Sequence, residues 1–282
     1  MKTWRGILDL AIPYLEGKGV PDAAVAAELL VARLLKCGRG LLSSHLDESP
    51  PEKYVEAMRR GMARLAGGEP VQYVLGEWDF RRLTLTCDKR ALIPRPETEE
   101  LVTRVLKFLQ SHFSMDDRPL VVDVGTGSGC IAISLLLAFP DLIMTAADIR
   151  RDTLRTACGN AEKHHCRERF HAVQTDLFSA FGPGAQLICA NLPYIPTETC
   201  REIEPSRYEP LTALDGGADG FELYRLLFAQ LTNKIKDECL ILCEIEYRQR
   251  ELALETAEAF FPGRSIRVLE DLAGQPRLLR IE

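Results

Sequence analysis

The apolar positions near the start of the chain recur with the period of a helix. Those that share one face are Trp4, Ile7, Leu8, Ala11 and Leu15. Two further segments, residues 23–36 and 52–66, are rich in strong helix formers and are followed by glycines. The pattern predicts a small helical bundle, which we assign to a first domain of residues 1–68.

The pattern changes in residues 69–93. Between Leu83 and Cys87 apolar residues alternate with threonine, and a period of two is typical of a strand with one buried face. We therefore predict that residues 69–93 form a β-hairpin linker, with turn positions at Gly76 and Asp88.

Strands and helices alternate through a second domain, residues 94–282. Buried strands are predicted at residues 119–125, 141–148, 170–176, 186–191 and 238–245, and helices at 97–110, 130–139, 151–164 and 220–235. Two more strands follow residue 261, and we expect them to pair antiparallel through a turn around Gly274. This order predicts an α/β fold: a Rossmann-like, seven-stranded, mostly parallel sheet with helices on both faces, joined by the hairpin to the helical bundle.

The composition narrows the class of protein and its partners. With 46% hydrophobic and 27% charged residues, 282 positions suit an ordinary globular protein of two domains. No apolar run approaches the roughly 18 residues of a membrane span, and the first residues lack a signal-peptide cleavage site. We therefore expect a cytoplasmic protein with no membrane partner. A net charge of −6 and a nearly neutral helical bundle argue against direct nucleic-acid binding.

The cysteines and histidines do not form a metal-binding pattern. The nine cysteines include no C-x-x-C pair, and His164–His165 lacks ligand spacing. An odd number of cysteines scattered through apolar segments is typical of reduced core thiols. We predict no metal site.

A glycine-rich loop follows the first buried strand. Asp123 precedes Gly125, Gly127 and Gly129 in the pattern D-x-G-x-G-x-G, and a helix begins at once. Glycines allow a tight turn and let a ligand approach the backbone. The dinucleotide fingerprint needs glycine at position 130, which is Cys130, whereas the observed spacing is associated with S-adenosylmethionine in Rossmann-like methyltransferases. A turn that only reverses the chain is the alternative. The candidate cofactor-binding residues of this loop are Asp123, Gly125, Thr126, Gly127, Ser128 and Gly129.

The next two strands also end in acidic residues. Asp148 can accept hydrogen bonds from both hydroxyls of a ribose, although Asp148 or Asp152 can instead cap the following helix. Asp176 can accept from an adenine amino group, and Leu177 offers apolar contact to the ring. Asn191 follows the fourth strand. The carboxyl edge of a parallel sheet is where such folds bind ligands, so we assign these residues to one cofactor site.

The stretch LICANLPYIP ends a buried strand with an amide, a proline and an aromatic ring. An amide nitrogen is a poor nucleophile, so an enzyme that methylates it must hold the group in place. Asn191 Oδ1 can accept one N–H of such an amide, and the Leu192 carbonyl, held by Pro193, can accept the other. Tyr194 can lie against the planar group. We therefore predict a catalytic and substrate-binding site at these four residues, with a simple Asn-Pro turn as the alternative.

The sequence NLPY resembles the N-P-P-Y signature of methyltransferases that act on amino groups of adenine, guanine or glutamine. The segments GEPVQYVLGEWDF, LIPRPETEELV, VVDVGTGSGCIAISL, YEPLTALDGGADGFELYRLL and DLAGQPRLL resemble the peptide chain release factor glutamine methyltransferase family (HemK/PrmC). The resemblance runs from about residue 67 to the C-terminus and implies a class I S-adenosylmethionine-dependent methyltransferase. It implies methylation of the side-chain amide of the glutamine in the Gly-Gly-Gln motif of class I release factors, with S-adenosylhomocysteine as product. We also predict that the helical bundle docks this protein substrate, and we expect a monomer.

The sequence departs from the family pattern in a few places. Leu192 stands where the family usually has a proline, and Leu177 replaces a frequent tryptophan. Arg81–Arg82 occupies a position that is often aromatic, and Glu246 one that is often glycine. Two other functions stay open: an adenine or guanine amino-methyltransferase acting on DNA or RNA, and a non-catalytic factor that binds release factors or ribosomes. The macromolecule that gains methyl from S-adenosylmethionine distinguishes the three.

Overall fold

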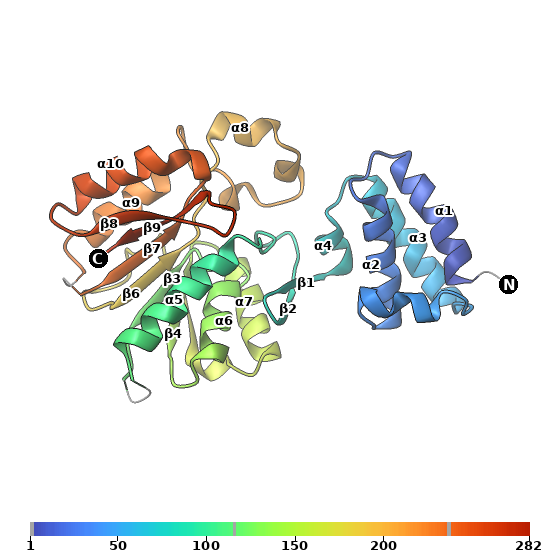
Figure 1. Cartoon of the computed structure of the whole chain (residues 1–282), viewed down its shortest axis with the longest axis horizontal. Coiled ribbons are helices and arrows are strands. Elements are labelled where there is room, and N and C mark those ends of the chain that lie inside the picture. Colours follow the sequence, from blue (N-terminus) through green and yellow to red (C-terminus); the bar gives the residue numbers. More distant parts are fainter. Residues whose placement is uncertain (1–2, 115–116, 236–237) are drawn as a thin grey trace. The chain divides into compact units, whose positions relative to one another are not determined.

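The computed structural model describes residues 3–114, 117–235 and 238–282 (Figure 1). The chain divides into two compact units, Met1–Trp78 and Asp79–Glu282. No helix in the described ranges is long and apolar enough to cross a membrane.

The first unit is built of helices. They are α1 (Trp4–Glu16), α2 (Ala23–Leu35), the 3-10 helix η1 (Arg39–His45), α3 (Glu52–Ala66) and α4 (Val71–Leu75). The Thr3 hydroxyl begins α1 by accepting a hydrogen bond from Gly6 N, at 3.3 Å. The predicted apolar stripe of this helix is buried, with Trp4 and Leu15 almost without exposure. The short helix α4 lies in a segment for which the sequence predicted only a hairpin.

A two-stranded sheet follows, made of β1 (Glu77–Phe80) and β2 (Leu83–Thr86). The hairpin is confirmed, but the turn between its strands lies at Arg81 and Arg82 and not at Gly76 or Asp88. Gly76 instead ends α4 in the left-handed conformation. Arg81 connects the turn to the next helix, since its backbone N donates to Glu99 Oε1 at 2.9 Å.

The second unit contains the predicted seven-stranded sheet. Its strands are β3 (Val121–Val124), β4 (Met144–Asp148), β5 (Phe170–Gln174), β6 (Leu187–Ala190), β7 (Leu240–Glu244), β8 (Ile266–Glu270) and β9 (Pro276–Ile281). The spatial order is β5-β4-β3-β6-β7-β9-β8. The first five strands pair parallel, whereas β9 pairs antiparallel with both β7 and β8, as predicted for the last pair.

Helices cover both faces of this sheet (Figure 1). On one face lie α5 (Thr98–His112), α6 (Cys130–Ala138) and α7 (Arg151–Lys163), and on the other α9 (Glu222–Leu231) and α10 (Arg250–Phe260). Shorter elements are α8 (Thr197–Glu202), η2 (Arg167–Arg169), η3 (Glu204–Arg207), η4 (Leu211–Ala213) and η5 (Tyr247–Gln249). Successive strand residues alternate between the two cores: Val121 belongs to the first and Val122 to the second. The sequence did not predict α8 or α10.

Candidate active site

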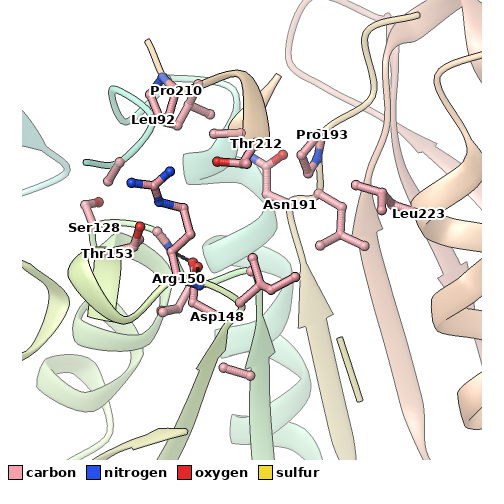
Figure 2. Close-up of a pocket in the computed structure, with 18 of the residues that line it drawn as sticks. Leu92, Ser128, Asp148, Arg150, Thr153, Asn191, Pro193, Pro210, Thr212 and Leu223 are labelled. Carbon is pink, nitrogen blue, oxygen red and sulfur yellow. Dashed lines mark hydrogen bonds between the residues drawn. The ribbon is translucent and has the colours of Figure 1, made fainter. Parts of the chain in front are cut away.

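A cavity of about 430 Å³ lies at the carboxyl ends of β3, β4, β5 and β6 (Figure 2). This volume falls within the range of small-molecule sites. In the sheet, β3 lies between β4, the next strand along the chain, and β6. The strand order therefore reverses at β3, and the cavity lies at this switch point, where α/β folds bind ligands. Figure 2 shows Asp148 and Arg150 on one side of the cavity and Asn191 and Pro193 on another.

The glycine loop between β3 and α6 forms part of the wall. The backbone N atoms of Gly125 and Thr126 both donate to the Ala147 carbonyl at 2.9 Å, which anchors the loop to β4. Gly125, Gly127 and Gly129 have φ values of 76°, 57° and 83°, a region that other residues rarely adopt. The cavity is lined by Gly125, Thr126, Gly127 and Ser128. Gly129 is not among the lining residues: it immediately precedes α6 and lies against Ala157.

Asp123 lies beneath this loop and does not line the cavity. Its side chain has no exposed surface, and its Oδ2 accepts a hydrogen bond from Thr126 Oγ1 at 2.7 Å. Burial raises the pKa of Asp123 to about 7, and the Thr126 hydroxyl opposes that rise. The sequence analysis assigned Asp123 to the cofactor-binding residues. In the structure its side chain contacts Thr126 of the loop and does not reach the cavity.

Asp148, at the end of β4, holds the loop from the opposite side. Its Oδ2 accepts from Gly127 N at 3.1 Å and its Oδ1 from Arg150 N at 2.9 Å. Burial raises the pKa of Asp148, and these two N–H groups lower it. The residue before α7 is Arg150, and no side chain caps that helix, so neither Asp148 nor Asp152 is its N-cap. A carboxylate has about four acceptor positions, so Asp148 can still accept from a ligand.

The end of β5 supplies the next part of the wall. Asp176 and Leu177 both line the cavity, and Leu177 has a φ of 49°. Ile149, which follows Asp148, lines it as well although 57% of its side chain is exposed. Sequence reasoning missed Ile149. The signal in the sequence is an apolar residue directly after a predicted strand-end carboxylate.

Asn191 and Leu192 lie at the end of β6. Asn191 lines the cavity, and its Nδ2 donates to Thr98 Oγ1 at 3.0 Å. Leu192 N donates to the Tyr224 hydroxyl at 3.2 Å, and its buried side chain lies against Gly125. Thr98, from the start of α5, is a residue of this site that the sequence analysis did not identify.

The remaining two residues of the predicted NLPY site differ in position. Pro193 lines the cavity, whereas Tyr194 is not among its lining residues. The Tyr194 carbonyl accepts from Gln249 Nε2 at 3.0 Å, and burial raises the pKa of its hydroxyl. The structure therefore brings Asn191, Leu192 and Pro193 together with the glycine loop and the two strand-end carboxylates, but not the Tyr194 side chain.

Comparison with known proteins covers both units. The PrmC N-terminal domain family matches residues 7–76, and the methyltransferase small domain family matches residues 103–201. A release factor glutamine methyltransferase of Bacillus subtilis is 35% identical over 284 residues, which cover 99% of this chain and 97% of that protein. The human MTRF1L release factor glutamine methyltransferase is 31% identical over 295 residues, covering 99% and 85%. The chain belongs to the release factor glutamine methyltransferase family.

The resemblance seen in the sequence is thereby confirmed, and solved structures agree on the fold. The catalytic domain of human METTL16, in a complex with an RNA hairpin, is similar with a TM-score of 0.54. It is 15% identical, and the match covers 71% of this chain and 75% of that chain. An identity this low shows a shared methyltransferase fold and no more.

A second segment borders the cavity. Pro210, Leu211, Thr212 and Ala213 line it, as does Leu92, and Figure 2 labels Pro210, Thr212 and Leu92 among the lining residues. The segment is attached through Glu209, a buried carboxylate that accepts from Ile93 N at 3.0 Å and is paired with Arg95. The LIPRPETE motif therefore does more than begin a helix: it connects the 209–213 segment to the cavity wall. No cluster suited to a metal ion occurs among the residues described.

Proposed function

We propose that this protein transfers the methyl group of S-adenosylmethionine to the side-chain amide nitrogen of the glutamine in the Gly-Gly-Gln motif of class I release factors. The observation that carries the proposal is the position of Asn191 in the same cavity as Asp148 and the glycine loop. A site for the methyl donor and a side chain that can bind an amide, placed at the same cavity, suit methyl transfer to an amide. The names of the relatives in this family support the choice of substrate.

The chain's residues suit the cofactor. The glycine backbone leaves space for close approach of a ligand, and Asp148 keeps acceptor capacity for ribose hydroxyls. Asp176 suits an adenine amino group, with Leu177 and Ile149 as apolar neighbours. Asp123 acts from beneath by holding Thr126. When bound, S-adenosylmethionine supplies a methyl group made electrophilic by its sulfonium, and S-adenosylhomocysteine remains after transfer.

The amide-binding residues address the weak nucleophilicity of an amide nitrogen. Because Asn191 Nδ2 is already used by Thr98, Oδ1 is the atom left to accept a substrate N–H. We assign the other N–H to the Leu192 carbonyl, with Pro193 restricting the local backbone. Two acceptors on the amide N–H bonds raise the electron density of nitrogen and stabilise the positive charge that develops as the N–C bond forms. Orientation supplies much of the remaining rate, and the proton leaves with solvent.

Tyr194 differs from the other three residues of this site in its position. We assigned its ring to the plane of the glutamine amide, yet in this structure the ring does not line the cavity. Its contribution to substrate binding therefore requires a change of side-chain position when the release factor binds.

The first unit is proposed to dock the release factor, with residues 1–68 as the docking domain, 69–93 as linker and 94–282 as the catalytic domain. A groove between α1 and α3 is lined by apolar side chains together with Arg59, and two of the apolar residues, Leu10 and Tyr14, are 71% and 45% exposed. Exposed apolar side chains gathered in a groove suit a protein partner. We further propose a cytoplasmic monomer that contacts no nucleic acid directly.

The test is to identify the macromolecule that gains the methyl group. The purified full chain is incubated with labelled S-adenosylmethionine and either a class I release factor, DNA or RNA. We expect label only in the release factor, mapped to the glutamine of its Gly-Gly-Gln motif, and none in a release factor with asparagine at that position. Label in DNA or RNA would support the amino-methyltransferase alternative, and no label in any of them would support the binding-factor alternative.

A further inference from the structure

A buried carboxylate that the proposed reaction does not use lies at the end of β7. Glu244 has no exposed surface, and neither of its carboxylate oxygens has a hydrogen-bond partner among the described residues. Buried polar groups are almost always hydrogen-bonded, because an unpaired one loses its hydration without replacement. Glu244 therefore needs an explanation beyond packing.

The neighbours of Glu244 include Asn191, whose side chain is the candidate catalytic amide, and Thr98, which accepts a hydrogen bond from that amide. Strands β6 and β7 pair Ala190 with Cys243, so Asn191 and Glu244 follow at adjacent strand ends. The side chains of Thr98 and Asn191 lie close enough to lower the pKa of Glu244, although burial outweighs them and raises it to about 7.

In the cluster of Asn191, Thr98 and Glu244, the donor and acceptor of each contact can be assigned. Thr98 is 1% exposed, and its hydroxyl oxygen accepts from Asn191 Nδ2 at 3.0 Å. A hydroxyl also has one proton to donate, and the Glu244 carboxylate is a neighbouring acceptor. An ionised carboxylate only accepts. The observed hydrogen bond therefore runs from the Asn191 amide to Thr98, and the Thr98 proton has the Glu244 carboxylate as a neighbouring acceptor.

We infer that Glu244 is a positioning residue that, through Thr98, keeps the Asn191 amide oriented with Nδ2 toward the protein and Oδ1 toward the substrate. The opposite orientation presents N–H groups to the N–H groups of the glutamine amide, which repel. An ionised Glu244 excludes that orientation because it cannot donate. A protonated Glu244 can donate to Thr98 and so removes the constraint. This role rests on the proposed function.

Other groups near Glu244 enter any pH measurement. They are Arg277 on β9, Glu97 before α5, Tyr194 after β6, Tyr224 on α9 and Cys130 on α6. Burial raises the pKa of both tyrosines and of the thiol, which keeps them neutral near pH 7. Asp123 also has a pKa of about 7. It is present in every variant proposed below, so the difference between two profiles isolates Glu244.

The test compares single-turnover methylation of a release factor by the full-length wild type and Glu244→Gln, with saturating S-adenosylmethionine, across pH. A glutamine resembles the protonated acid, since it can both donate and accept. We expect the two rates to be similar near pH 6 and to differ by on the order of 10- to 100-fold near pH 8, the scale for a misplaced catalytic group. The control Glu246→Gln, the same substitution two residues away, should leave the rate and profile unchanged. Equal rates at pH 8, or a ratio that does not change with pH, overturn the inference.

A second pair of variants covers the case in which Glu244→Gln does not fold. Thr98→Val removes the hydroxyl at nearly constant volume and should lose the rise in rate with pH, whereas Thr98→Ser keeps the hydroxyl and should retain it. A Thr98→Val enzyme with the wild-type profile overturns the inference. If the wild type methylates no release factor, the proposed function fails. The inference is then tested on the side-chain amide resonances of Asn191, which should shift with pH near 7 in the wild type and not in Glu244→Gln. Resonances that behave alike in both proteins overturn it.

Discussion

The side chain of Leu192 fills the space that a Cβ atom on Gly125 would occupy. A Cβ built there lies 2.8 Å from Leu192 Cδ2, and Gly125 also has a φ of 76°. The first residue of the glycine loop and the second residue of NLPY are therefore in direct contact. A substitution at Leu192 consequently acts on the loop as well as on the proposed substrate site.

Leu192→Pro tests which of these roles matters. Proline keeps the carbonyl that we assign to the substrate, so the single-turnover rate should stay within a few-fold of wild type. It removes the N–H that donates to Tyr224 and part of the contact with Gly125, which should lower the free energy of unfolding by roughly 1–3 kcal/mol. Urea denaturation and single-turnover methylation measure the two effects. A large loss of rate in a stable protein contradicts the assignment of the carbonyl.

Asp148→Ala should weaken the binding of S-adenosylmethionine by about 1.5–3 kcal/mol, the range for hydrogen bonds to a charged group. The change removes the proposed ribose acceptor and the contacts to Gly127 N and Arg150 N. Calorimetric titration measures the affinity, with Asp141→Ala as control because Asp141 is exposed and does not line the cavity. An unchanged affinity for Asp148→Ala removes this residue from the cofactor site.

Asn191→Ala should reduce the single-turnover rate by roughly 10²-fold or more while leaving cofactor affinity nearly unchanged. The reason is that the lost hydrogen bond strengthens as charge develops on the amide nitrogen. Asn191→Asp is a sharper companion: it keeps an acceptor but cannot donate to Thr98. Near-normal rates for Asn191→Ala would mean that NLPY is only a turn.

Leu10→Asp should raise the release factor concentration needed for half-maximal rate, without changing cofactor affinity or the rate at saturation. The substitution places a charge in the apolar groove of the first unit, where a docked protein would bury it. Leu272→Asp is the matched control, because Leu272 is fully exposed in the turn between β8 and β9. Removal of residues 1–68 should have the same effect in a stronger form. Undiminished efficiency at low release factor concentration argues against the docking domain.

The stability of the protein should depend on the titration of Glu244. Burial raises its pKa from 4.5 to about 7, so folding favours the protonated form. The resulting stabilisation is complete below pH 4.5 and is lost as the pH rises to about 7. Glu244→Gln is neutral at every pH and should lose less stability than the wild type over this range. Urea midpoints measured at a series of pH values test this, and parallel curves for the two proteins contradict it.

Local patterns in the sequence were sufficient for the order of the strands in the second unit and for most of its long helices. The apolar run before Asp123 predicted a buried strand, and the glycine spacing predicted a loop at a position where the structure has a cavity-lining loop. The helix α10 was missed because its buried residues are small or weakly apolar, namely Ala253, Thr256 and Ala257. Such residues produce little of the periodic signal on which a helix prediction depends.

The sequence by itself determined which residue types follow each strand, because strand, turn and helix preferences act over a few neighbouring positions. Only the tertiary structure decided which of those residues meet. Asn191 contacts Thr98 across 93 positions, and Glu244 joins them through the pairing of β6 with β7. The same folding buries Asp123 under the loop and leaves the Tyr194 side chain outside the cavity lining. Strand order and register bring distant segments together, and no local periodicity contains that information.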